Sequence, residues 1–274
     1  MSYFKYLPPE RIDVLKNSTI RFTQPAALND LFEFRPTIER ITDIPSRKAL
    51  VLGLIEWLRK YSRKDKTGEL QRAEEVTARI IQPDAMRNFR EHRLNSDLLE
   101  AANRLLSLAN DLVGILSLSD DPTDPLMWGH YAASNTGFLI QFYANHPWFK
   151  QGPNDDEAQH IRKVKYISME ESSSVDFRPR DFIYTKSNRW EYEREWRMIW
   201  PLQEYYRKLP GDIYLFGVPP SCIWKIILGV RSTREFETEL NYIVNKIAVR
   251  PVPVVRARID ESGSTIKVPG WSNL

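Results

Sequence analysis

The residues in this chain that most suggest chemistry are the glutamates of segment 190–197, which reads WEYEREWR. They stand at every second position and lead into Met198–Trp200, an apolar run that predicts a buried strand. Because alternate side chains of a strand share one face, we expect Glu193 and Glu195 to project together. Two neighbouring carboxylates repel unless cations or a ligand offset them. The alternative is a solvated helix, in which Glu193 pairs with Arg197 four residues later.

Two serines lie on another predicted strand, which spans Gly114–Ser119. Alternation places Ser117 and Ser119 on the same face of that strand. Their hydroxyls can hold a carboxylate by hydrogen bonds, or in principle act as nucleophiles. The alternative is that both are ordinary strand residues.

Two aromatic residues lie three positions apart on a predicted helix over Leu126–Ala133, with Pro125 in its first turn. The spacing puts Trp128 and Tyr131 on one face of that helix. They can stack on a planar ligand such as a base. Packing in the hydrophobic core is the alternative.

Basic and polar residues near the start of the chain are candidates for binding an anionic ligand. Lys5 and Tyr6 belong to the first predicted strand, and Arg21 belongs to the second. Lysine and arginine bind phosphates through charge-assisted hydrogen bonds, although on a strand they usually project into solvent. Asn29 lies in a polar turn, where asparagine commonly caps the backbone.

Several classes of site lack support. The chain has neither a P-loop nor a G-x-G-x-x-G motif, and its four histidines show no local metal-ligand spacing, so no metal is expected. Its one cysteine, Cys222, adjoins an apolar strand and is predicted to be a buried, inert thiol. A metal-dependent nuclease remains a third hypothesis, because convergent carboxylates could be supplied by Asp120, Asp121, Glu193 and Glu195.

The elements that must position these residues follow from the apolar patterns. Strands are predicted at residues 3–6, 19–23, 114–119, 138–142, 164–167, 214–216, 225–229 and 252–259, with a helix at 10–16 and another that opens with a capping box at Ser232–Glu235. Helical spacing predicts an insertion over 46–112, whose last helix would be capped by Ser96. The pattern indicates an α+β fold, with a mixed or antiparallel sheet and helices set aside.

Length and composition narrow the class of protein. A chain of 274 residues with 42% hydrophobic residues suits a single elaborated domain over 1–274. A net charge of +3 neither requires nor excludes nucleic acid. Charged arginines of the insertion could contact an anionic partner or form a solvated face; they are Arg79, Arg87, Arg90 and Arg93. No signal peptide and no bilayer-spanning apolar run is visible, so we expect a cytoplasmic protein without membrane contact.

Taken in order, these segments resemble the bacterial domain of unknown function 2971. The resemblance is carried by residues 3–6, Arg21-Phe22-Thr23 with 29–33, Ser117-Leu118-Ser119, 126–132 with Gly137-Phe138, the glutamate segment, and Ile226–Gly229. Leu31 stands where that family usually has proline.

The layout in turn resembles the ADP-ribosyltransferase fold, including its toxin branch that modifies nucleic acid. This resemblance implies a split sheet and an enzyme that uses NAD as substrate. An early basic residue (Lys5 beside Tyr6, or Arg21) would bind the diphosphate. Ser117 and Ser119 would form the middle element and hold Glu195, and Asn29, Trp128 and Tyr131 would complete the NAD site.

The same resemblance implies roles for the two glutamates. Glu195 would stabilise the oxocarbenium-like transition state, and Glu193 would orient the acceptor or act as base. A nucleic-acid acceptor is favoured over a protein acceptor. A role as a toxin or phage-defence effector, with an antitoxin as partner, is expected. The rival hypothesis is a non-catalytic module that binds nucleic acid or protein.

Overall fold

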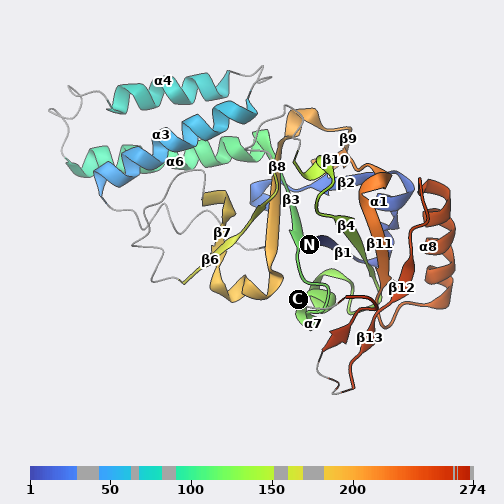
Figure 1. Cartoon of the computed structure of the whole chain (residues 1–274). Coiled ribbons are helices and arrows are strands. Elements are labelled where there is room, and N and C mark those ends of the chain that lie inside the picture. The colour runs from blue at the N-terminus through green and yellow to red at the C-terminus, as the bar shows by residue number, and fades with distance from the viewer. Residues whose placement is uncertain are drawn as a thin grey trace.

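The computed structural model describes residues 1–29, 43–62, 68–81, 91–150, 160–168, 182–261, 263 and 265–271. These residues form helices together with mixed and antiparallel sheets, so the predicted α+β class is confirmed. Figure 1 shows a body built around a sheet, with a group of helices extending from one side of it.

A seven-stranded mixed sheet lies at the centre of the body. Its spatial order is β12, β11, β4, β1, β3, β8, β5, and all neighbouring strands are antiparallel except β11 and β12. The strands are β1 (Ser2–Leu7), β3 (Val113–Ser119), β4 (Phe138–Tyr143), β5 (Arg162–Lys163), β8 (Glu195–Pro201), β11 (Ile223–Leu228) and β12 (Val254–Arg256).

The central sheet opens between β1 and β3. These strands share a single register pair, Phe4 with Ser119. Further along β3, Ile115 instead forms an antiparallel bridge with Thr23, just after β2 (Thr19–Phe22). Side chains of β1 and β3 can therefore line a space between the two strands.

Smaller sheets complete the β structure. β2 pairs with β10 (Ile213–Gly217), which pairs with β9 (Arg207–Leu209). The remaining two pairs are β6 (Lys165–Ile167) with β7 (Thr185–Ser187), and β13 (Arg258–Ile259) with β14 (Ile266–Lys267).

Helices cover both faces of the central sheet. α1 (Asp13–Lys16) and α8 (Arg234–Ile247) pack on one face, and α7 (Pro125–Tyr131) packs on the other. Short 3-10 helices connect the elements: η1 (Pro9–Ile12), η2 (Pro25–Ala27), η3 (Pro147–Phe149), η6 (Phe182–Tyr184), η7 (Asn188–Glu193), η8 (Leu202–Glu204) and η9 (Pro220–Cys222).

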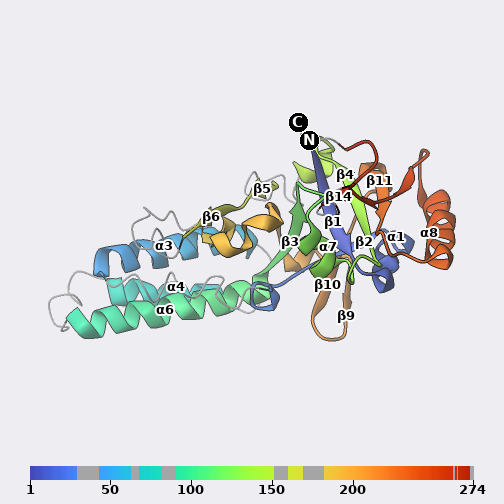
Figure 2. The ribbon, with the colours of Figure 1, turned by 90° about the horizontal axis from the view of Figure 1, so that it is seen from below.

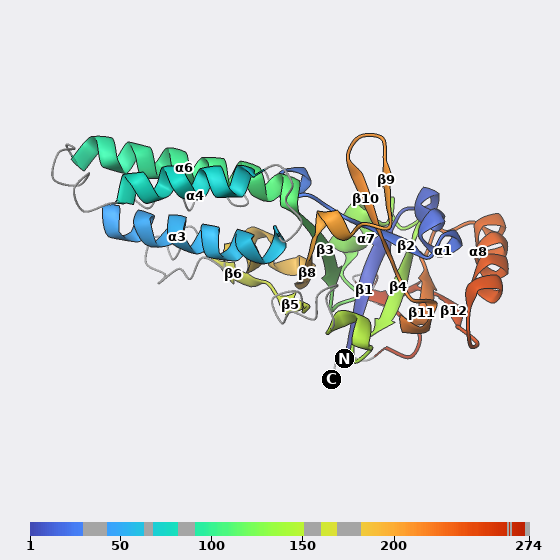
Figure 3. The same cartoon turned by 90° about the horizontal axis from the view of Figure 1, so that it is seen from above.

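The predicted helical insertion is present as α3 (Ile44–Tyr61), α4 (Glu69–Ile81) and α6 (Glu91–Leu112). Figure 3 shows these three helices lying side by side, away from α8. Their apolar faces form one cluster that also includes Ile115 of β3 and Ile199 of β8. These three helices, called the arm below, are therefore joined to the sheet by a continuous hydrophobic core.

Two predicted caps are wrong. Ser96 lies inside α6, which begins at Glu91, because the helical run extends upstream of the apolar stripe. The cap of α8 is Thr233, whose hydroxyl accepts from the amide of Phe236, whereas Ser232 donates to backbone carbonyls of the turn before β4.

The predicted burial of the one cysteine agrees with the structure. Cys222 is buried, and burial raises its pKa to about 12, as predicted for an inert thiol. No helix in the described part of the chain is long and apolar enough to cross a lipid bilayer. Arg87, Arg90 and residues 30–33 fall outside the described residues.

Candidate functional site

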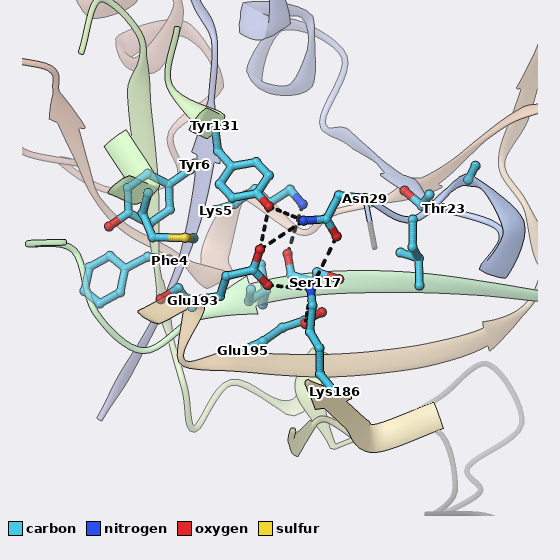
Figure 4. A pocket seen from close by; sticks show the side chains of 15 residues that line it. Phe4, Lys5, Tyr6, Thr23, Asn29, Ser117, Tyr131, Lys186, Glu193 and Glu195 are labelled. Atoms are coloured by element: carbon cyan, nitrogen blue, oxygen red, sulfur yellow. Dashed lines mark hydrogen bonds and ion pairs between the residues drawn. The ribbon is translucent and has the colours of Figure 1, made fainter. Parts of the chain in front are cut away.

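A small pocket lies where β1 and β3 separate, with a volume of about 170 Å³. Its lining comes from six places: β1, β3, the segment from Thr23 to Asn29, α7, β7 and the glutamate segment (Figure 4). The residues that line it are Phe4, Lys5, Tyr6, Thr23, Ala27, Leu28, Asn29, Ser117, Leu118, Ser119, Met127, Tyr131, Lys186, Glu193 and Glu195.

The two glutamates converge on this pocket, but they do not share a strand. Glu193 ends the 3-10 helix η7, and Glu195 begins β8. Arg194 between them has a φ of 45°, in the left-handed region, which turns the chain between the two elements. The prediction of one continuous strand is therefore wrong, while the predicted proximity is confirmed: both carboxylates contact the same lysine (Figure 4).

Glu195 is enclosed by donors. The guanidinium of Arg197 reaches its two carboxylate oxygens at 2.8 Å each, and Lys186 Nζ lies 3.3 Å from Oε2. Burial alone raises the pKa of Glu195, but Arg197, and then Lys186 and Ser117, outweigh it and hold the pKa near 2. Its three hydrogen bonds thus all come from cations, and one guanidinium holds both of its oxygens.

This arrangement also decides between two expectations about the segment. Arg197 pairs with Glu195, two residues earlier on the same face of β8. The alternative of a helical pair between Glu193 and Arg197 is therefore wrong. The guanidinium is fully buried and donates in addition to the carbonyl of Ile183 at 2.6 Å. Removing Glu195 would leave a buried, uncompensated cation, which makes this pair essential for stability.

Glu193 has different neighbours. Its Oε1 accepts from the Tyr131 hydroxyl at 2.5 Å and from Asn29 Nδ2 at 3.0 Å. Its Oε2 accepts from Lys186 Nζ at 2.6 Å. These are three donors for about four acceptor positions, so among the described residues Glu193 keeps one position for a ligand. Burial and then the Glu193 charge raise the pKa of Tyr131, so its hydroxyl stays protonated.

The sequence reasoning missed Lys186, which joins the two carboxylates. Its side chain is 2% exposed, and its ammonium also contacts Asn29 Oδ1 at 3.3 Å and stacks over the ring of Trp190. A signal was present, because Lys186 lies two residues after the apolar run Phe182–Tyr184. An isolated lysine there is equally typical of a solvated loop, so its role becomes visible only in three dimensions.

Of the two early basic candidates, Lys5 lines the pocket and Arg21 does not. Lys5 Nζ donates to the carbonyl of Ser117 at 2.9 Å. Burial lowers its pKa to about 8, with Arg11 and Arg21 acting in the same direction and Glu195 and Glu193 opposing. An ammonium held there suits an anionic group at the pocket.

The other candidate residues divide between the pocket and the core. Ser119 and Tyr6 line the pocket, but their hydroxyls bond the backbone of Asp121 rather than Glu195. Trp128 is fully buried, donates to the carbonyl of Pro122 and packs edge-on against Tyr6. It belongs to the core cluster against which Tyr131 packs, and of the two only Tyr131 lines the pocket, so the alternative of core packing holds for Trp128.

The chemistry of the donors does not suit a metal centre at this pocket. Within the residues that the structure describes, no group of three or more His, Cys, Asp or Glu side chains is arranged to hold a metal ion. The ammonium of Lys186 already stands between the two carboxylates that would be the natural ligands. The positive charge that offsets their repulsion is thus supplied by the chain.

Comparison with known proteins gives a family likeness without a function. Residues 127–198 match the model of a family described as "Protein of unknown function (DUF2971)". The match supports that part of the resemblance and covers α7, β4 and the glutamate segment up to the start of β8. Neither the curated proteins nor the solved structures yield a significant match.

Proposed function

We propose that this chain is an NAD-dependent ADP-ribosyltransferase-like enzyme that acts at the pocket between β1 and β3. The observation that carries the proposal is a buried pair of carboxylates, one of which keeps an acceptor position facing a small pocket. The early, middle and late elements expected for such an enzyme come from the neighbouring strands β1, β3 and β8. Their adjacency supports the proposal independently of the family match.

The reaction would break the bond between C1′ of the ribose and the ring nitrogen of nicotinamide. The bonding electron pair leaves with nicotinamide, and positive charge develops on the ribosyl group. A carboxylate that accepts a hydrogen bond from a ribose hydroxyl stabilises this charge. A nucleophile of the acceptor then attacks C1′ and gives up its proton to a base.

The hydrogen bonds favour moving one expected role from Glu195 to Glu193. Glu195 was expected to stabilise the transition state, but its negative charge is already offset by the paired guanidinium of Arg197 and by Lys186. Glu193 has an acceptor position left and faces the pocket. We therefore assign transition-state stabilisation to Glu193. Glu195 becomes a positioning residue that fixes Lys186.

The size of the pocket limits which part of NAD enters it. A volume of about 170 Å³ lies below the roughly 300–1,000 Å³ of sites that enclose a drug-sized ligand. The nicotinamide and its ribose would occupy the pocket, against Phe4 and Met127, and the rest of the molecule would lie outside. Lys5 would pair with the diphosphate, as expected for the early basic residue.

The acceptor is proposed to be nucleic acid rather than protein. The expected roles in toxicity or phage defence, and the expected antitoxin, stay predictions. Incubation with adenine-labelled NAD and separate pools of DNA, RNA and cell protein tests the activity. We expect nicotinamide release and label in one nucleic-acid pool, both lost in Glu193→Gln and kept in Glu191→Gln, an exposed control from the same segment. No NAD turnover and no NAD binding would overturn the proposal in favour of a binding module.

A further inference from the structure

We propose that the face of the β2–β10–β9 sheet that carries Arg21 and Arg207 binds the phosphate backbone of a nucleic-acid strand beside the pocket. The inference rests on the proposed function, because it gives the acceptor of that site a binding surface. It starts from Arg21, a basic residue that the pocket itself does not use.

Strand register places the two arginines on one face of the sheet. Leu215 of β10 lies opposite Arg21 on one side and opposite Arg207 on the other. Directly paired residues of antiparallel strands project to the same face. The other face carries Phe22, Tyr214 and Lys208, which are also aligned, and Phe22 belongs to the main core.

The two arginines of this face have no carboxylate partner among the described residues, whereas the nearby Arg11 of η1 pairs with Asp13. The Nε of Arg21 is buried and has no hydrogen-bond partner among the described residues. Burial, and then the charge of Arg11, lowers its pKa, and both arginines act in the same direction on Lys5. Arg207 is exposed and has no ion pair within the part of the chain that the structure describes. Like charges brought together in this way favour a bound anion.

The basic face is continuous with the pocket. Thr23 lies two residues after Arg21, on the same side of the chain by alternation, and lines the pocket. In the other direction, β9 is the outer strand of a hairpin that projects from the body (Figures 2 and 3). A chain laid along the face would therefore run from the hairpin to the pocket.

The spacing of the charges suits a repeating anion. Neighbouring strands lie about 4.8 Å apart, and alternate residues of a strand lie about 6.6 Å apart. Arg21, Arg207 and Thr23 are therefore spaced to contact more than one phosphate of a strand. Hydrogen bonds and ion pairs to phosphates supply most of the sequence-independent affinity for nucleic acid. An acidic protein is the competing partner, and the test below includes it.

Binding of a labelled single-stranded DNA or RNA oligonucleotide, without NAD, tests the inference by fluorescence anisotropy across salt concentrations. Arg207→Ala is compared with Lys208→Ala, which removes the same charge from the next residue on the opposite face. We expect Arg207→Ala to weaken binding roughly fivefold at 0.1 M salt and to reduce the salt slope by about one phosphate contact. Lys208→Ala should leave both unchanged, and Arg21→Gln should resemble Arg207→Ala.

Nicotinamide release without acceptor separates this inference from the proposed function. Arg207→Ala should release nicotinamide at the wild-type rate while losing label transfer to nucleic acid. Equal binding by wild type, Arg207→Ala and Arg21→Gln would overturn the inference, as would an equal loss in Lys208→Ala. Tighter binding of a poly-glutamate peptide than of the oligonucleotide would assign the face to protein instead. If NAD is never turned over but Arg207 still governs oligonucleotide binding, the proposed function fails and the surface stands.

Discussion

At the scale of single residues, the two glutamates of the site differ in the charge of their partners. Glu195 accepts from the cations Arg197 and Lys186, and its pKa near 2 reflects that pairing. Glu193 is held by the neutral donors Tyr131 and Asn29 and by Lys186. One carboxylate thus completes a buried ionic network, while the other is presented to the pocket.

This difference predicts unequal effects for the two amide substitutions. Glu195→Gln should lower the free energy of unfolding by about 3–5 kcal/mol, because it leaves the fully buried Arg197 without its carboxylate partner, while Lys186 keeps Glu193. Glu193→Gln should cost less, since it leaves Lys186 paired with Glu195. Urea unfolding measures both, with the exposed Glu191→Gln as control. A larger loss in Glu193→Gln than in Glu195→Gln would contradict the assignment.

The lowered pKa of Lys5 predicts the pH dependence of ligand binding. The ammonium, which attracts an anion, is present below about pH 8 and is lost as the pH rises through that value. NAD affinity should therefore be constant at pH 6–7 and fall about tenfold between pH 7 and 9. Tyr131 and Tyr166 do not titrate in this range, because their pKa values are raised. In Lys5→Met, calorimetry should show weaker binding with no such fall.

At the scale of elements, the left-handed residue Arg194 determines how the glutamates meet. It ends η7 and directs the chain into β8, and its guanidinium pairs with Asp120 at 2.5 Å. Glycine adopts this conformation without steric cost, and a β-branched residue does so with difficulty. The junction, rather than either element, therefore positions the site.

The stability of variants at position 194 should depend on how easily the new residue adopts the left-handed backbone conformation. Arg194→Gly should change stability by less than about 1 kcal/mol, because Asp120 keeps Lys163 and Trp196 as partners and the relieved backbone strain offsets the lost ion pair. Arg194→Val should lower stability by about 1–2 kcal/mol and reduce NAD turnover by misplacing Glu193. Thermal unfolding and turnover together measure this. Equal stability of the two variants would show that the left-handed turn is not a constraint.

The elements were more predictable from sequence than their assembly. Apolar patterns were enough to predict β1, β3 and β4, and helical spacing predicted α3 and most of α6, because burial of one face dictates these patterns. No helix was assigned to the charged residues 69–81, so α4 was not predicted as a separate helix. Periodicity failed at Glu193, where a 3-10 helix replaced the strand, and at Trp128, where one face of α7 serves the core. Lys186 was missed because its partners come from the turn after β2 and from either side of Arg194. Such tertiary pairing leaves no local spacing to detect.

At the scale of the whole molecule, the helical arm and the sheet share a core. Leu105 of α6 is fully buried in the same cluster as Ile115 of β3 and Ile199 of β8, both in the central sheet. The arm extends from one side of the sheet in Figure 1, and it contributes none of the pocket lining. It does support one lining segment, because Leu28 packs against the arm's core and Asn110 of α6 bonds Gln24 and Ala26.

Replacing a buried leucine of the arm should lower the free energy of unfolding far more than replacing an exposed one. Leu105→Ala should lower the free energy of unfolding by about 2–5 kcal/mol through loss of buried volume. Leu52→Ala, at a position 47% exposed, should change it by less than about 0.5 kcal/mol. Circular dichroism of urea unfolding measures both. An unchanged stability for Leu105→Ala would contradict the shared core.

The most direct test of the central claim is the initial rate of nicotinamide release from NAD by wild-type protein and by folded Glu193→Gln, with Glu191→Gln as control. We predict measurable release by wild type and control, and a loss on the order of 10²–10³-fold in Glu193→Gln without a matching rise in KM, since the carboxylate acts mainly on the transition state. Wild-type release by Glu193→Gln, or no release by any of the three proteins under conditions where each is folded, would contradict the claim.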